Sequence, residues 1–98
     1  HQISYAEQQG RYILIHYLDG SCHKYAIRHG DFAPLLLAYP YFCDCIRGIV
    51  VNFEAVDSLM RDRFLLKDGT SIPISRLKYE KVREAFLSFF YSRTRGGL

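Results

Sequence analysis

The sequence predicts a mostly β fold that is completed by two helices. Three patterns carry this prediction. Apolar and polar residues alternate in period two near the N-terminus, Asp-Gly dipeptides stand twice between β-prone runs, and apolar residues recur at helical spacing near the end of the chain. With 98 residues, of which 49% are hydrophobic, the chain can form a single domain over 1–98 with a core of its own.

Composition excludes several classes of protein. The longest uncharged stretch, 32–43, contains two prolines and is too short for a membrane span. Three cysteines are an odd number in a chain that shows no secretory signal, which favours reduced thiols and a cytoplasmic location. The formal charge of +3 is compatible with a nucleic-acid partner without selecting one.

The first element is predicted to be a β-hairpin. Residues 11–18 place Ile13 and Ile15 on one face and Leu14 and His16 on the other. Asp19-Gly20 then supplies a dipeptide suited to the positive φ angles of a tight turn, and 22–27 form the returning strand. We interpret His16 as a packed strand residue and not as a catalytic base.

A short helix is expected over 31–38. Asp31 is a plausible N-cap, Pro34 is tolerated in a first turn, and Pro40 ends the helix. We expect this helix to cover one open side of a sheet.

The middle of the chain predicts further strands. Residues 41–56, centred on 49–51, are apolar on both faces, which indicates a strand buried on both sides. Residues 56–60 continue in extended form to a turn at 61–62. Runs 64–66 and 71–74 flank Asp68-Gly69 and predict a second hairpin, in which Pro73 requires an edge position because it lacks an amide donor.

The last element is an amphipathic helix expected over about 77–91, with Ser75 as N-cap. Its apolar stripe consists of Val82, Ala85, Phe86, Phe89 and Phe90. We expect a disordered tail over 93–98.

Charge is distributed unevenly along the chain. Residues 1–50 carry four basic and four acidic side chains, whereas 76–98 carry six basic and two acidic ones. The C-terminal quarter therefore holds the excess charge, either as a solvated helix face or as part of a binding surface.

Three segments, taken in their order along the sequence, resemble the LytTR DNA-binding domain. They are the opening 2–7 with 10–16, the central 42–52 with its arginine and its valine-asparagine ending, and the closing 66–69 with 72–76. The resemblance spans about 2–91. It implies small antiparallel sheets, a place at the C-terminus of bacterial response regulators, and readout of paired direct repeats in DNA by loop residues. It also implies a strand ahead of Gln2, so we expect a chain trimmed at its N-terminus that leaves a strand edge unpaired.

The resemblance assigns DNA-binding residues by position. Arg11-Tyr12 ends the loop before a long strand, Arg47 stands at the signature position, and Arg76 follows the 73–75 turn. A guanidinium presents a rigid fork that matches guanine O6 and N7. Lys78 and Arg63 are assigned to phosphates, which position a protein without reading sequence.

Neither an enzyme nor a metal protein is predicted. No nucleophile–base pattern and no phosphate-binding glycine loop is present in the sequence. Cys43-x-Cys45 lacks a second ligand pair at finger-like spacing, so we expect no metal and no cofactor.

We therefore predict a sequence-specific DNA-binding output domain of a two-component transcriptional regulator. Its partners would be double-stranded DNA, a second copy on that DNA, and a receiver or sensor segment outside this chain, with no membrane. The alternative is a non-enzymatic protein-interaction or dimerisation module with an eroded DNA face. It is suggested by Asp44, Ile46 and Gly48, which stand where the family often has a basic residue, a histidine and a serine.

Overall fold

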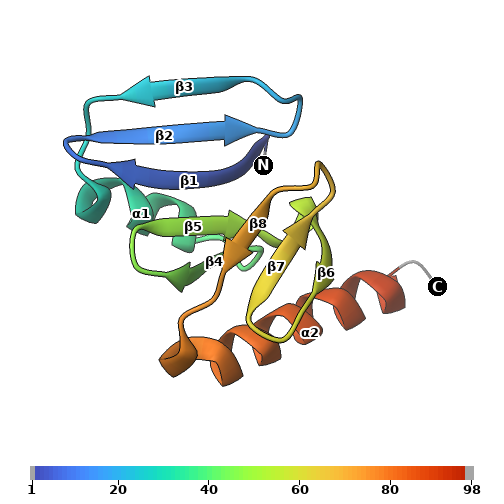
Figure 1. Cartoon of the computed structure of the whole chain (residues 1–98). Coiled ribbons are helices and arrows are strands. Elements are labelled where there is room, and N and C mark those ends of the chain that lie inside the picture. The colour runs from blue at the N-terminus through green and yellow to red at the C-terminus, as the bar shows by residue number, and fades with distance from the viewer. Residues whose placement is uncertain (1, 97–98) are drawn as a thin grey trace.

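The computed structural model of the chain describes residues 2–96, with side chains described to residue 93. Two antiparallel sheets and two α-helices make up the fold (Figure 1). The five-stranded sheet has the order β3 (Cys22–Tyr25), β2 (Tyr12–Tyr17), β1 (Ile3–Gln9), β5 (Ile49–Asn52), β4 (Phe42–Ile46). The three-stranded sheet has the order β6 (Val56–Leu59), β7 (Arg63–Leu66), β8 (Ser71–Pro73). This confirms the predicted class of small antiparallel sheets.

The first hairpin is confirmed as β2 and β3. Its turn places Gly20 at φ +91°, a conformation that a residue with a Cβ rarely adopts. Ile13 and Ile15 are buried on one face of β2, while His16 lies on the other face, stacked on Tyr5 with ring centroids 4.0 Å apart. His16 is therefore packed within the sheet, as expected.

The short helix α1 (His29–Leu37) begins two residues earlier than predicted. Arg28, not Asp31, is the N-cap residue. Asp31 lies in the first turn, where its carboxylate accepts from Arg28 Nε at 3.2 Å and faces the positive end of the helix dipole. Ala33 and Leu36 are buried against β4 and β5, so the helix covers the sheet as expected.

The prediction of one strand over 41–56 was wrong. The segment forms a hairpin of β4 and β5 followed by a 3-10 turn at Phe53–Ala55. Gly48, at φ +83°, allows the reversal, which the β-prone residues on either side of it had concealed. The centre of the segment is nevertheless buried on both faces, because Val50 contacts one core and Val51 the other.

The second hairpin is confirmed as β7 and β8, with a turn around Asp68-Gly69. Pro73 ends β8, which is an edge strand, so its missing amide leaves no ladder position unpaired. Residues 61–62 form the expected bend between β6 and β7.

The C-terminal helix differs from its prediction at both ends. A 3-10 turn at Arg76–Lys78, here called η2, precedes α2 (Tyr79–Gly96). Ser75 precedes η2, but its side chain makes no capping hydrogen bond. The structure places 93–96, expected in a disordered tail, within the helix, and residues 97–98 lie outside the described part.

Two cores flank the central strands, and α2 covers one of them. Val82, Phe86 and Phe89 pack on the core around Phe53 and Phe64. Ala85 and Phe90, predicted for the same stripe, are exposed because the helix contacts the core along a narrower line than the pattern suggested. The second core lies between α1 and the five-stranded sheet.

The outer strands of the five-stranded sheet are β3 and β4, whereas β1 is hydrogen-bonded on both sides. Within the described residues, the unpaired edges of this sheet are therefore those of β3 and β4. Among the described residues, no helix has both the length and the apolar character needed to cross a bilayer.

Candidate nucleic-acid interface

Three turns that are distant in sequence lie at the same end of the molecule (Figure 1). They are the β1–β2 turn, the β4–β5 turn and η2. The amide of Gln8 donates to the carbonyl of Gly48 at 2.8 Å, which joins the first two turns. The amide of Ser75 donates to the carbonyl of Cys45 at 2.8 Å, which anchors η2 beside β4. Backbone hydrogen bonds thus fix the three turns relative to one another.

Each of these turns presents one exposed arginine: Arg11, Arg47 and Arg76. Within the part of the chain that the structure describes, none of the three takes part in an ion pair. By contrast, Arg28 is paired with Asp31. Three unpaired guanidinium groups on fixed turns are available to an anionic partner.

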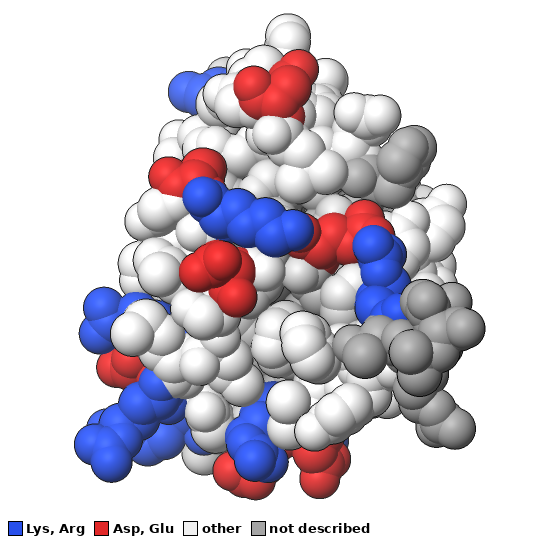
Figure 2. All heavy atoms as spheres, turned by 90° about the vertical axis from the view of Figure 1, so that its right-hand side faces the viewer, with Lys and Arg blue, Asp and Glu red and all other residues white. Residues whose placement is uncertain are grey.

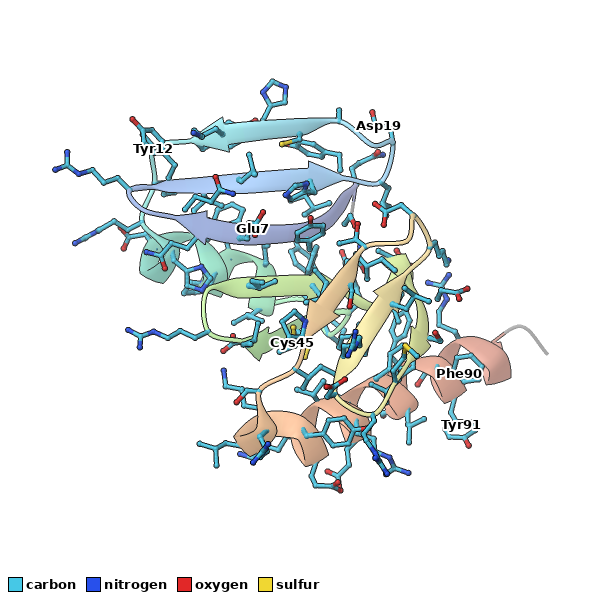
Figure 3. All side chains as sticks on the ribbon, viewed as in Figure 1. Glu7, Tyr12, Asp19, Cys45, Phe90 and Tyr91 are labelled. Atoms are coloured by element: carbon cyan, nitrogen blue, oxygen red, sulfur yellow. The ribbon has the colours of Figure 1, made fainter. Side chains whose placement is uncertain are left out.

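Tyr12 opens β2 beside Arg11 and points outward at this end of the sheet (Figure 3). Tyr12 is 42% exposed, and Lys24 Nζ lies 5.1 Å from the centroid of its ring. Lys24 was not predicted as a site residue. The register of the hairpin around Asp19-Gly20 could have indicated it, because Lys24 pairs with Leu14, which is two residues from Tyr12. Lys24 therefore adds a cation on the β3 side of the same end.

Lys78 and Arg63, both predicted to contact phosphates, are engaged in ion pairs. Lys78 Nζ lies 2.9 Å from Asp44 Oδ2, and Arg63 Nε lies 3.0 Å from Asp62 Oδ1. The turn that carries Arg63 contacts the segment before η2, because Ile74 donates its amide to the Asp62 carbonyl at 2.9 Å. Arg63 thus lies next to the three-turn end and not within it.

The opposite side of the molecule has a mixed surface, with basic and acidic side chains interspersed (Figure 2). It includes the β2–β3 and β7–β8 turns. The hydroxyl of Ser21 donates to Asp19 and lowers the pKa of that carboxyl, and the amide of Thr70 does the same for Asp68. These acids stabilise their own turns, and they would repel a phosphate backbone.

The polar contacts within the five-stranded sheet are structural. His16 Nε2 lies 3.1 Å from Glu7 Oε1, and its ring stacks on Tyr5. Among the described residues, no three His, Cys, Asp or Glu side chains gather in a way that could hold a metal ion.

The two thiols of the Cys-x-Cys segment are buried in the core (Figure 3 labels Cys45). Burial raises the pKa of Cys43 to about 11 and that of Cys45 to about 12, from an ordinary value of 9.0. Cysteine binds zinc as a thiolate, and burial in the core keeps both thiols protonated at neutral pH. The buried position therefore disfavours metal binding. Cys22 is exposed on β3.

We expect thiol reactivity to separate the cysteines. At pH 8 a disulfide reagent such as DTNB should label Cys22 rapidly in the folded domain, and all three cysteines in guanidinium. Rapid labelling of all three thiols without denaturant would contradict the buried placement.

The raised pKa values of Cys43 and Cys45 also predict how stability depends on pH. Their contribution to the stability of the folded state is fully present below pH 9 and is lost as the pH rises towards 11–12. Urea midpoints measured from pH 8 to 11 should therefore fall.

The family profile of the LytTr DNA-binding domain matches residues 1–87. The chain belongs to the LytTR family. Its matched region takes in all eight strands, α1, η2 and the first half of α2. The three arginine-bearing turns all fall within it.

A solved structure shares this LytTR fold. It is the LytTr DNA-binding domain of a protein from Bacillus cereus described as a methyl-accepting/DNA response regulator. The two align with a TM-score of 0.74 at 17% identity, over 86% of this chain and 80% of that one. No curated protein matches the chain at a significant level.

Proposed function

We propose that this LytTR domain is the DNA-binding output domain of a cytoplasmic two-component transcriptional regulator, and that it reads sequence through Arg11, Arg47 and Arg76. The observation that carries the proposal is their convergence. Three exposed arginines without ion-pair partners among the described residues lie on three different turns at one end of the fold. Backbone hydrogen bonds hold those turns together.

The chemistry of these side chains suits a duplex. A guanidinium can donate two hydrogen bonds to guanine in the major groove. A projecting turn enters this groove more easily than the flat face of a sheet does. Tyr12 adds an exposed phenol next to Arg11. Lys24, Lys78 and Arg63 surround the turns and are proposed to contact phosphates, which would set the register of the domain on the duplex.

The partners of the domain follow from this role. We propose direct-repeat promoter sites in double-stranded DNA, with two copies of the domain bound side by side. A receiver or sensor segment outside the present sequence would control the binding.

A protein-interaction role is the second candidate, and a specific feature favours it. A groove of about 800 Å³ runs between β6 and α2, lined by aromatic side chains that include Phe86 and Phe89. This groove lies away from the arginine-bearing turns, on the side shown in Figure 2. It could serve dimerisation whether or not DNA binds.

A salt series separates the two candidates. We expect affinity for short duplexes to fall steeply between about 50 and 200 mM salt, because each neutralised phosphate contributes about −0.9 to the slope of log K against log salt. Fluorescence anisotropy with labelled duplexes measures this slope. Weak binding with no salt dependence on every duplex tested would rule out the DNA-binding role and leave the interaction module.

A further inference from the structure

We propose that the carboxylate of Asp44 occupies a binding site for a DNA backbone phosphate while the domain is free, and leaves it when DNA binds. The proposal rests on the proposed DNA-binding function and deepens it. It assigns a phosphodiester ligand to a particular hollow, and it explains why an acidic residue stands at a DNA-facing end.

The site is a hollow of about 250 Å³ between β4 and the start of α2. Its charged lining consists of Asp44, Lys78 and Lys81. Lys78 Nζ donates to Asp44 Oδ2 at 2.9 Å and lies 3.4 Å from the Asp44 carbonyl oxygen. Lys81 makes no ion pair within the described part of the chain. The hollow is therefore lined by two lysines and a single carboxylate, which leaves it with a net positive charge.

The hollow lies beside two of the arginine-bearing turns. Asp44 precedes Arg47 by three residues, and Lys78 follows Arg76 by two. A duplex that reaches both arginines therefore brings its backbone close to Lys78. Lys81 stands one helical turn after Lys78, so both ammonium groups can face the same phosphate.

An ammonium group binds a carboxylate oxygen and a phosphate oxygen in the same way, by a charge-assisted hydrogen bond. Asp44 therefore competes with the DNA backbone for Lys78. The side chains of Asp44 and Lys78 are each about 40% exposed. The carboxylate therefore has room to rotate into solvent when a phosphate takes its place.

The test is Asp44→Asn, which keeps the shape of the side chain and removes its charge. We expect affinity for every duplex to rise about 3- to 10-fold at 100 mM salt, because Lys78 no longer has to give up a carboxylate when it binds a phosphate. The salt slope should stay nearly unchanged, because Lys78 neutralises the same phosphate in both proteins. Asp57→Asn is the matched control. Asp57 is an exposed acid on β6, and we expect its removal to change affinity less than about 2-fold.

A double-mutant cycle decides whether the gain acts through Lys78. In a Lys78→Ala background, Asp44→Asn should give almost no gain, because the competition has been removed. An equal gain in both backgrounds would mean general repulsion and would overturn the proposal, as would weaker binding by Asp44→Asn. Asp44→Ser repeats the comparison if the asparagine variant fails to fold. Binding of the unmodified domain without any gain in either variant refutes only this inference, whereas no binding by any variant refutes the proposed function as well.

Discussion

Asn52→Leu is expected to lower the free energy of unfolding by about 3–5 kcal/mol, because it leaves two polar backbone groups without partners. Asn52 is fully buried at the end of β5. Its Nδ2 donates to the Ile3 carbonyl at 2.9 Å, and its Oδ1 accepts from the Glu54 amide at 2.8 Å. The side chain thus ties β1 to the turn between the two sheets. Leucine has the same branched arrangement of side-chain heavy atoms but can make neither bond.

Urea unfolding measures this effect as a lower midpoint at an unchanged m-value. Gln9→Ala is the control, because it removes an exposed amide from the end of β1 and should change stability by less than about 0.5 kcal/mol. A loss below about 1 kcal/mol for Asn52→Leu would show that the amide does not hold the two elements together. The expected loss of about 3–5 kcal/mol would explain the asparagine of the family signature by its structural role and not by contact with DNA.

Arg76→Ala should reduce the preference of the domain for its best site by about 1–3 kcal/mol while leaving its affinity for random duplexes nearly unchanged. The reason is that a guanidinium aimed at base edges contributes only where the matching base is present. Lys78→Ala should instead weaken binding to all duplexes alike. The best site is obtained by selection from a random pool, and anisotropy then gives affinities for it and for a scrambled duplex.

Arg93→Ala is the matched control for Arg76→Ala. Arg93 is an exposed arginine near the far end of α2, where it is paired with Glu54. Its removal should leave DNA affinity unchanged. Equal losses for Arg76→Ala on selected and scrambled duplexes would show that Arg76 contacts phosphate and reads no base.

Local chemistry made much of the fold predictable from the sequence. Asp19-Gly20 and Asp68-Gly69 each marked a turn because the backbone conformation is dictated by the dipeptide itself. The β4–β5 hairpin was missed because β-prone residues stand on both sides of its turn and no Asp-Gly or Asn-Gly dipeptide marks it, so only Gly48 indicated the reversal. The exposure of Ala85 and Phe90 depends on the line along which α2 meets the core, which periodicity does not fix.

The candidate site needed the three-dimensional structure. The resemblance to the family gave Arg11, Arg47 and Arg76 one at a time, but their convergence depends on bonds such as Gln8 to Gly48 across 40 positions of sequence. The Asp44–Lys78 pair joins residues 34 apart, and no local pattern reveals it.

NMR titration of the ¹⁵N-labelled domain with a selected duplex will show whether the three arginine-bearing turns contact DNA. We predict that the largest amide shift changes fall at Gly10-Arg11, Arg47-Gly48 and 76–78, with little change at Asp19-Gly20 and Asp68-Gly69 on the opposite side. Changes concentrated at those opposite turns, or in the groove between β6 and α2, would show that DNA binds elsewhere on the domain.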